Sequence, residues 1–166
     1  FVKALNCLNP PSKGAFYGQC QPCRQIEAQA FPDLAILRVV EGSRELKIEQ
    51  VRAMQQTLAL APYQSKYRVV LIPDFQRATT GASNALLKSL EEPPSRAILI
   101  LTADARESLL ETIASRCEVV RLRPMRIADL AKELQERHQL SEIESRELAQ
   151  LAGGRVGTAL SYLRDE

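Results

Sequence analysis

The stretch from Arg68 to Pro94, RVVLIPDFQRATTGASNALLKSLEEPP, decides the fold. It opens with Val69-Val70-Leu71-Ile72, an apolar and mostly β-branched run that is typical of a strand buried on both faces. Pro73 lacks the backbone donor that a strand ladder needs, so the strand should end there and leave Asp74 at its carboxyl end. Ligands of open α/β sheets gather beyond that edge, which makes Asp74 a candidate site residue.

The same stretch predicts a helix directly after the strand. Thr79 or Thr80 can accept a hydrogen bond from the free amides of a first helical turn, and the leucines that follow form one apolar stripe. Pro93-Pro94 prevents the helix from continuing past Glu92. A buried strand that leads into an amphipathic helix is one half of a parallel α/β unit.

The flanking sequence repeats this alternation of strands and helices. Further apolar runs predict strands at 35–40, 97–101 and 118–122, and helical spacing predicts helices at 1–6, 24–30, 48–58 and 109–114. The expected fold class is therefore α/β, with a parallel sheet flanked by helices.

Beyond Pro124 the apolar spacing is helical only. It predicts three short helices, with Gly153-Gly154 between the last two, and such short helices must bury their apolar faces against each other. The predicted domains are an α/β domain over 1–123 and a three-helix domain over 124–166.

Composition indicates an ordinary globular protein. The chain has 166 residues, of which 45% are hydrophobic and 25% charged, and a net charge of +2. No basic block points to direct nucleic-acid binding, and no apolar run is long enough to span a bilayer. No secretion signal is visible, so we expect a cytoplasmic setting in which the cysteines are thiols or metal ligands rather than disulfides.

Cys7, Cys20 and Cys23 form a candidate metal site. The Cys20-x-x-Cys23 spacing suits two thiolates on one zinc ion, and Cys7 lies upstream across a loop rich in proline and glycine. A redox pair and ordinary packing of small side chains remain as alternatives.

Two motifs carry a resemblance to a known family. Asn84–Pro94, NALLKSLEEPP, and Ser115-Arg116-Cys117 resemble segments of the AAA+ clamp-loader subunits of bacterial DNA polymerase III. The resemblance covers essentially the whole chain and implies an AAA+ α/β domain followed by a helical lid. In that family the first strand and the phosphate-binding loop precede the helix that here begins at Phe1.

The family's strand order makes a prediction about the sheet. It places the strand that precedes the phosphate loop between the strands predicted at 97–101 and 118–122. We therefore expect that the strands at 35–40, 68–73, 97–101 and 118–122 do not form one continuous sheet. An upstream segment or a neighbouring chain should fill the gap, because unpaired strand edges are unfavourable.

The resemblance also implies a degenerate nucleotide site. Pro73 stands where the family's ATPases have a magnesium-binding carboxylate, and Asp74 stands in place of the water-orienting glutamate. Gly157 replaces an arginine of the last lid helix, and Arg155, two residues earlier, would point about 200° away around a helix. We expect neither ATP hydrolysis nor tight ATP binding, and Asp74 can equally be a solvated strand-end or helix-capping carboxylate.

In clamp loaders the arginine of the Ser-Arg-Cys tripeptide contacts ATP that is bound to the neighbouring subunit. The resemblance assigns this role to Arg116, with Ser115 and Cys117 beside it. A guanidinium suits the role because it is always charged and can bind phosphate oxygens in pairs. The alternative is that Arg116 only satisfies the last carbonyl groups of a short helix, and that Cys117 is a small core residue.

The family's zinc module contains a fourth cysteine, at the position that Tyr17 occupies here. Tyrosine is a poor zinc ligand, so Cys7, Cys20 and Cys23 would need water or another residue to complete the coordination.

An intact arginine with a degenerate site resembles the delta-prime type of subunit more than the gamma/tau ATPase. That type implies partners: the gamma/tau and delta subunits directly, and the sliding clamp and primed DNA through the assembled complex. The alternatives are the domain of a gamma/tau-like ATPase and a zinc-binding interaction module.

Overall fold

The computed structural model describes residues 1–164 and divides the chain into two compact units. The first unit spans 1–119 and the second begins at Val120, so the boundary predicted at Pro124 lies inside the second unit. No helix of the described part combines the length and the hydropathy that crossing a membrane requires.

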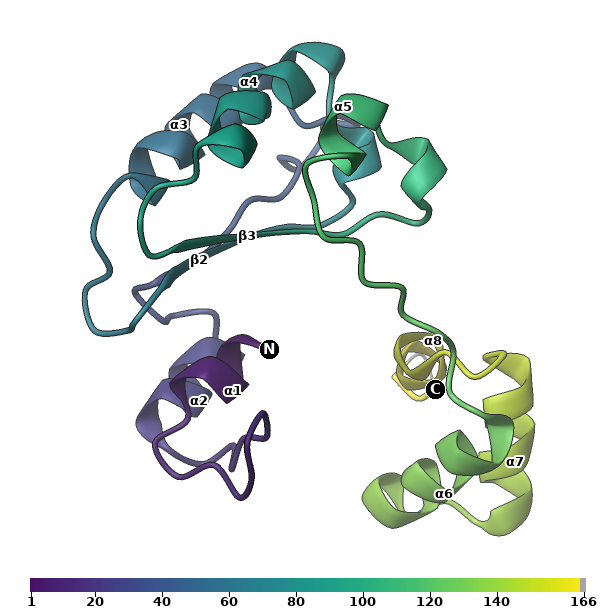
Figure 1. Ribbon diagram of the computed structural model, residues 1–166. Helices are drawn as coiled ribbons and strands as arrows, with labels where there is room; N and C mark the ends of the chain where they lie inside the picture. The colour runs from purple at the N-terminus through teal and green to yellow at the C-terminus, as the bar shows by residue number, and fades with distance from the viewer. Residues whose placement is uncertain (165–166) are drawn as a thin grey trace. The chain divides into compact units, whose positions relative to one another are not determined.

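A parallel three-stranded sheet forms the centre of the first unit (Figure 1). β2 (Arg68–Ile72) lies between β1 (Leu34–Ile36) and β3 (Ala97–Leu101), with Val70 paired to Ala35 on one side and to Leu99 on the other. The side chains of Val69, Val70 and Ile72 are fully buried, as the apolar run predicts for a strand covered on both faces.

Two long helices cover one face of this sheet, and α1 and α2 lie on the other side (Figure 1). α4 (Thr80–Glu91) begins where predicted, with the Thr79 hydroxyl accepting from the amide of Ala82 at 3.2 Å. α3 (Ile48–Leu58) packs beside α4, and the Gln55 amide group of α3 donates to the Ala85 carbonyl of α4 at 2.9 Å. Their apolar faces join the buried strand residues in one core.

Shorter elements complete the first unit. They are α1 (Val2–Asn6), α2 (Gln21–Glu27), the 3₁₀ turns η1 (Phe75–Arg77) and η2 (Arg106–Ser108), and α5 (Glu111–Ala114). α2 begins and ends three residues before the range predicted from 24 to 30, because Pro22 is well suited to the first turn of a helix and Cys20 takes the N-cap position.

The prediction of a strand at 118–122 is wrong for the described structure. This segment has no regular secondary structure, and its apolar side chains Val119, Val120 and Leu122 are 48, 74 and 91% exposed. A strand requires a hydrogen-bonded neighbour, and β3 pairs only with β2 among the described residues. Residues 118–122 are therefore not part of the sheet, which agrees with the expectation that the four predicted strands do not form one continuous sheet. That an upstream segment or a neighbouring chain pairs with the free edge of β3 stays a prediction. β1 is likewise shorter than predicted and ends at Ile36.

The second unit is a three-helix bundle, as the sequence predicts. It consists of α6 (Ile127–His138), α7 (Glu142–Leu151) and α8 (Val156–Tyr162). Leu130, Leu134, Ala149 and Ala159 lie in its buried core. α7 starts with a capping box, in which Ser141 and Glu144 each accept from the other's backbone amide.

Asp33, directly before β1, is a fully buried carboxylate that organises a loop of the first unit. It accepts from the amides of Tyr63, Gln64 and Ser65 at 2.6, 2.8 and 2.8 Å, and Arg68 Nη2 lies 3.4 Å away. Burial by itself would raise the pKa of Asp33, but the three amide donors outweigh it and hold the pKa below its ordinary value.

We expect Asp33→Asn to destabilise the first unit by about 2–3 kcal/mol, since it replaces an ionic acceptor of several buried amides by a neutral side chain. The lowered pKa of Asp33 means that its stabilisation is present above the ordinary carboxyl pKa and is lost as the pH falls through the folded value. Urea unfolding at pH 7 and at about pH 3 should therefore show a smaller difference between variant and parent at the lower pH. An equal difference at both values would contradict this account.

Gly154, which lies between α7 and α8, is hydrogen-bonded to the segment that precedes α6. Its carbonyl accepts from the Met125 amide at 2.9 Å, and its backbone has a φ of +75°. A Cβ at this position would lie 2.2 Å from the Met125 carbonyl oxygen, so both the backbone conformation and the close approach require glycine.

We expect Gly154→Ala to lower the unfolding free energy by about 1–3 kcal/mol because of backbone strain and this contact. Gly157→Ala is the matched control, because a Cβ at Gly157 in α8 would meet nothing within 4 Å. It should raise stability by about 0.5–1 kcal/mol through the helix propensity of alanine. Thermal unfolding of both variants checks the pair, and equal effects would rule out the proposed constraint.

Candidate functional site

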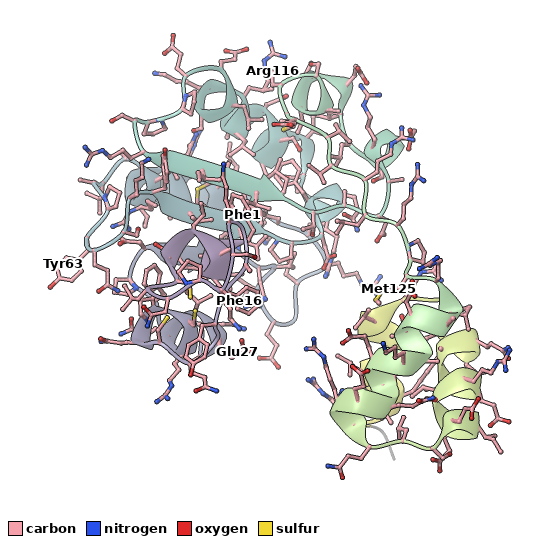
Figure 2. All side chains as sticks on the ribbon, turned by 60° about the horizontal axis from the view of Figure 1, so that its bottom comes forward. Phe1, Phe16, Glu27, Tyr63, Arg116 and Met125 are labelled. Atoms are coloured by element: carbon pink, nitrogen blue, oxygen red, sulfur yellow. The ribbon has the colours of Figure 1, made fainter. Side chains whose placement is uncertain are left out.

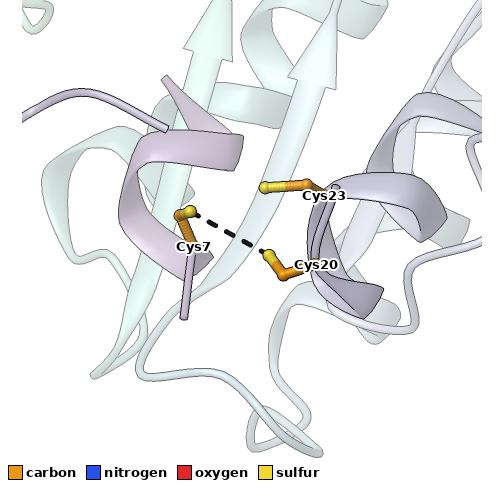
Figure 3. Close-up of side chains that lie close together, drawn as sticks. All are labelled: Cys7, Cys20 and Cys23. Atoms are coloured by element: carbon orange, nitrogen blue, oxygen red, sulfur yellow. Dashed lines mark hydrogen bonds between the residues drawn. The ribbon is translucent and has the colours of Figure 1, made fainter. Parts of the chain in front are cut away.

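The structure brings Cys7, Cys20 and Cys23 together in the first unit (Figure 3). Cys7 directly follows α1, Cys20 is the N-cap residue of α2, and Cys23 lies in the first turn of α2. The packing of α1 beside α2, together with an ion pair between Lys3 and Glu27, closes the loop that separates the cysteines in the sequence.

The sulfur positions fit three corners of a zinc site. All three sulfurs lie within 4.8 Å of one another, and the Cys7–Cys20 separation is 3.9 Å. Thiolates 2.3 Å from a tetrahedral zinc would be about 3.8 Å apart. Sulfur is a preferred ligand of zinc, so both the donor set and the spacing suit this metal.

Backbone hydrogen bonds around the cluster favour the thiolate form of one cysteine, which is the form that binds metal. The pKa of Cys20 is lowered to about 7, first by a hydrogen bond from the Leu8 amide and then by one from the Cys23 amide. Burial raises the pKa of Cys23 to about 11. A metal ion would have to displace the proton of Cys23, so metal binding here is coupled to pH.

Tyr17 leaves the fourth corner of the cluster without a side-chain ligand. Its backbone amide donates to Cys7 Sγ at 3.1 Å, but its hydroxyl donates to the side chain of Gln19 at 3.0 Å. No further cysteine, histidine or carboxylate joins the cluster in residues 1–164. Water could complete the coordination, as it does in zinc sites with three protein ligands.

At the edge of the sheet, Asp74 directly follows Pro73 in a left-handed conformation with a φ of +52°. Its amide donates to the Thr102 hydroxyl at 3.2 Å, which ties the end of β2 to the end of β3. The carboxylate is exposed and accepts no capping hydrogen bond from η1. Of the two alternatives to a catalytic role, the solvated carboxylate agrees with this geometry and the helix cap does not.

Two polar residues near Asp74 were not singled out from the sequence as site residues. Gln76 Nε2 donates to Asp104 Oδ2 at 3.0 Å, which joins η1 to the segment that follows β3. Gln76 Oε1 is buried and has no hydrogen-bond partner among residues 1–164. Only the polar sequence Thr102-Ala103-Asp104 after an apolar strand could have pointed to this pair.

Arg116 lies just after α5, where a carboxylate and a carbonyl group hold its guanidinium. Nε donates to Glu91 Oε1 at 2.8 Å, Nη2 lies 2.7 Å from the same oxygen, and Nη1 donates to the Thr112 carbonyl at 2.9 Å. The side chain remains 36% exposed (Figure 2). Arg116 thus does satisfy a helix-end carbonyl, while part of it stays accessible.

The neighbours of Arg116 differ in their surroundings. Ser115 is exposed, and its hydroxyl donates to the Thr112 carbonyl at 3.4 Å. Cys117 is half-buried against the core of the first unit, and burial raises its pKa.

In the second unit Gly157 lies in the first turn of α8 and Arg155 is the N-cap residue before it, so Arg155 is not part of that helix.

Comparison with known proteins finds a matching family and similar sequences. The family model described as "DNA polymerase III, delta subunit" matches residues 1–126. The DNA polymerase III subunit delta' of Haemophilus influenzae is 39% identical over 61% of this chain and 31% of its own length. Subunit tau of Escherichia coli is 31% identical over 96% of this chain and 25% of its own length. The chain thus spans about a quarter to a third of these curated relatives.

Solved structures support the same fold. A DNA polymerase III gamma subunit-related protein from Thermotoga maritima has a TM-score of 0.52 and 31% identity, covering 72% of this chain and 44% of that one. The RuvB Holliday junction branch migration motor of the same organism has a TM-score of 0.60, 14% identity, and 82% and 45% coverage. The RuvB likeness shows the fold alone, and together the two confirm the predicted AAA+ fold class.

We expect the purified protein to hold about one zinc ion per chain at Zn–S distances near 2.3 Å. Cys20→Ser should remove most of it, and zinc should be released at acid pH, since protons compete for the thiolates. Cys117→Ser is the matched control because Cys117 lies outside the cluster. Elemental analysis and X-ray absorption check this, and a zinc-free protein with an unchanged fold would leave the cluster as packing only.

Proposed function

The chain belongs to the DNA polymerase III, delta subunit family, and we propose that it is part of a clamp-loader subunit that supplies Arg116 to ATP on a neighbouring subunit. This subunit would not hydrolyse ATP itself. It would act on the sliding clamp and on primed DNA through the assembled complex, in the cytoplasm. Its direct partners would be the gamma/tau ATPase and the delta subunit.

The observation that carries this proposal is the setting of Arg116. It stands in an intact Ser-Arg-Cys tripeptide, at the end of a helix of the first unit, and is held by two partners while remaining partly exposed. A guanidinium placed in this way can stabilise the charge that develops on a transferring phosphoryl group.

The proposal that the subunit does not hydrolyse ATP rests on the substituted positions. Proline cannot coordinate magnesium, so the end of β2 lacks the carboxylate that a P-loop ATPase uses there. Gly157 has no side chain to contact a phosphate. Asp74 is exposed, and its side chain is one methylene shorter than the glutamate that orients water in the family's ATPases.

A gamma/tau-like ATPase is the second candidate. The observation in its favour is that the alignment with Escherichia coli tau covers 96% of the chain, whereas the alignment with the delta' subunit of Haemophilus influenzae covers 61%. The two candidates differ in one measurable property, magnesium-dependent ATP turnover by the full-length subunit alone.

The cysteine cluster would serve this function structurally. A zinc ion held by Cys7, Cys20 and Cys23 would connect α1 to α2 through Zn–S coordination bonds. No step of ATP hydrolysis is assigned to it.

We expect Arg116→Ala, introduced into the full-length subunit, to lower the DNA-stimulated ATPase and the clamp loading of the reconstituted complex at least tenfold. Arginines supplied in trans contribute about 10³–10⁵ in rate to GTPases, and the other ATP sites of a loader reduce the observable share. Arg116→Lys should restore little, because an ammonium lacks the planar pair of donors. Folding should be unaffected, since exposed ion pairs contribute about 0–1 kcal/mol.

The same reconstitution separates the alternatives. Full ATPase and loading rates with Arg116→Ala would reduce Arg116 to a helix-end residue. Substantial ATP turnover by the subunit without its partners would instead assign the chain to the ATPase class.

A further inference from the structure

The contact between Arg116 and Glu91 joins the two segments in which the chain most resembles clamp loaders. Glu91 is the last residue of α4, where Pro93-Pro94 ends the helix, and Arg116 follows α5 by two residues. The contact therefore depends on how α4 and α5 pack against each other, and not on neighbouring positions in the chain.

Two partners contact the guanidinium of Arg116, and part of the side chain stays exposed. Nε and Nη2 face the same oxygen of Glu91, at 2.8 and 2.7 Å, along one side of the plane. Nη1 donates to the Thr112 carbonyl at 2.9 Å. A guanidinium has five N–H donors in one plane, and the two hydrogen bonds use one on Nε and one on Nη1. Each of the two terminal nitrogens carries two donors, so at least one N–H of Nη1 is left, and Nη2 makes only the ion-pair contact with Glu91.

Nη1 and Nη2 form the end edge of the guanidinium, the edge that can face two phosphate oxygens. Two parallel N–H groups on adjacent nitrogens can donate to two oxygens of one phosphate, which is the pairwise contact that arginine makes and lysine cannot. Because Glu91 lies along the side of the plane, an anion at the end edge does not have to displace it.

We propose that Glu91 is a positioning residue, which orients Arg116 so that its end edge is ready for the phosphate of a neighbouring subunit. This inference rests on the proposed role of Arg116 and adds a residue to it. The pair is solvent-exposed, at 36 and 50% for the two side chains, so it contributes little to stability. What it can supply is orientation, since a free arginine side chain samples many rotamers and the bound state needs one.

The test is Glu91→Gln in the full-length subunit, reconstituted with its ATPase partner, the sliding clamp and primed DNA. We expect the ATP turnover number to fall about threefold, less than in Arg116→Ala, because the arginine is still present but is less well oriented. The KM for ATP should be unchanged, because the nucleotide is bound by the other subunit. Glu91→Asp should restore part of the rate.

Glu111→Gln is the matched control. Glu111 lies on α5 itself and pairs with Arg106 at 2.7 Å, so this variant removes an equivalent exposed carboxylate–arginine pair and the same charge without touching Arg116. Its turnover number should equal that of the parent. An equal loss in both variants would mean that net charge, and not the orientation of Arg116, sets the rate.

A double variant and a spectroscopic measurement complete the test. Glu91→Gln should have no further effect on turnover in an Arg116→Ala background, because it acts only through Arg116. In the ¹⁵N-arginine-labelled subunit, the Nε–H signal of Arg116 should lose its protection from solvent exchange in Glu91→Gln but not in Glu111→Gln.

The outcomes separate this inference from the proposed function. If Arg116→Ala lowers turnover and Glu91→Gln does not, the positioning role is wrong and the arginine role stands. If Arg116→Ala has no effect, the proposed function fails, and the exchange measurement alone still shows whether Glu91 holds the guanidinium.

Discussion

β2 is hydrogen-bonded to β1 along one side and to β3 along the other, so it cannot shift in register without moving both neighbours. A slip by one residue would turn Val70 and Ile72 away from the core that α3 and α4 cover. Parallel pairing also brings the ends of β2 and β3 to one edge, where the Asp74 amide meets Thr102. The place of Pro73 and Asp74 thus follows from the pairing of a single strand.

The elements that could be predicted are those whose ends are marked by residues in the sequence itself. Thr79 and Pro93-Pro94 bracket α4, and apolar runs mark β2 and β3, so these elements formed where expected. The segment 118–122 has strand composition, but composition cannot supply a hydrogen-bonded neighbour. The Glu91–Arg116 contact was also missed, because it joins residues 25 positions apart through the packing of two helices. The spacing of the cysteines predicted the cluster. The direction of the Tyr17 side chain could not be predicted, because it depends on how the loop between Cys7 and Cys20 folds.

Two arginine–carboxylate pairs in the first unit differ in burial, and therefore in how easily they can be exchanged for other partners. Asp33 is fully buried beside Arg68, and its amide partners make it a part of the fold that cannot be lost without cost. Glu91 and Arg116 are exposed, so water and salt weaken their attraction. A pair of the second kind can change partners or share its donors with an incoming anion, and a pair of the first kind cannot.

The loop held by Asp33 has no regular secondary structure, yet the amides of Tyr63, Gln64 and Ser65 are bonded to a carboxylate that no solvent reaches. Their hydrogens can be replaced by deuterium only when this loop separates from the start of β1, about 30 residues earlier in the chain. The amides of this loop should therefore exchange as slowly as those of the strands, although the side chain of Tyr63 is exposed. Slow amide exchange in this chain thus extends beyond its helices and strands.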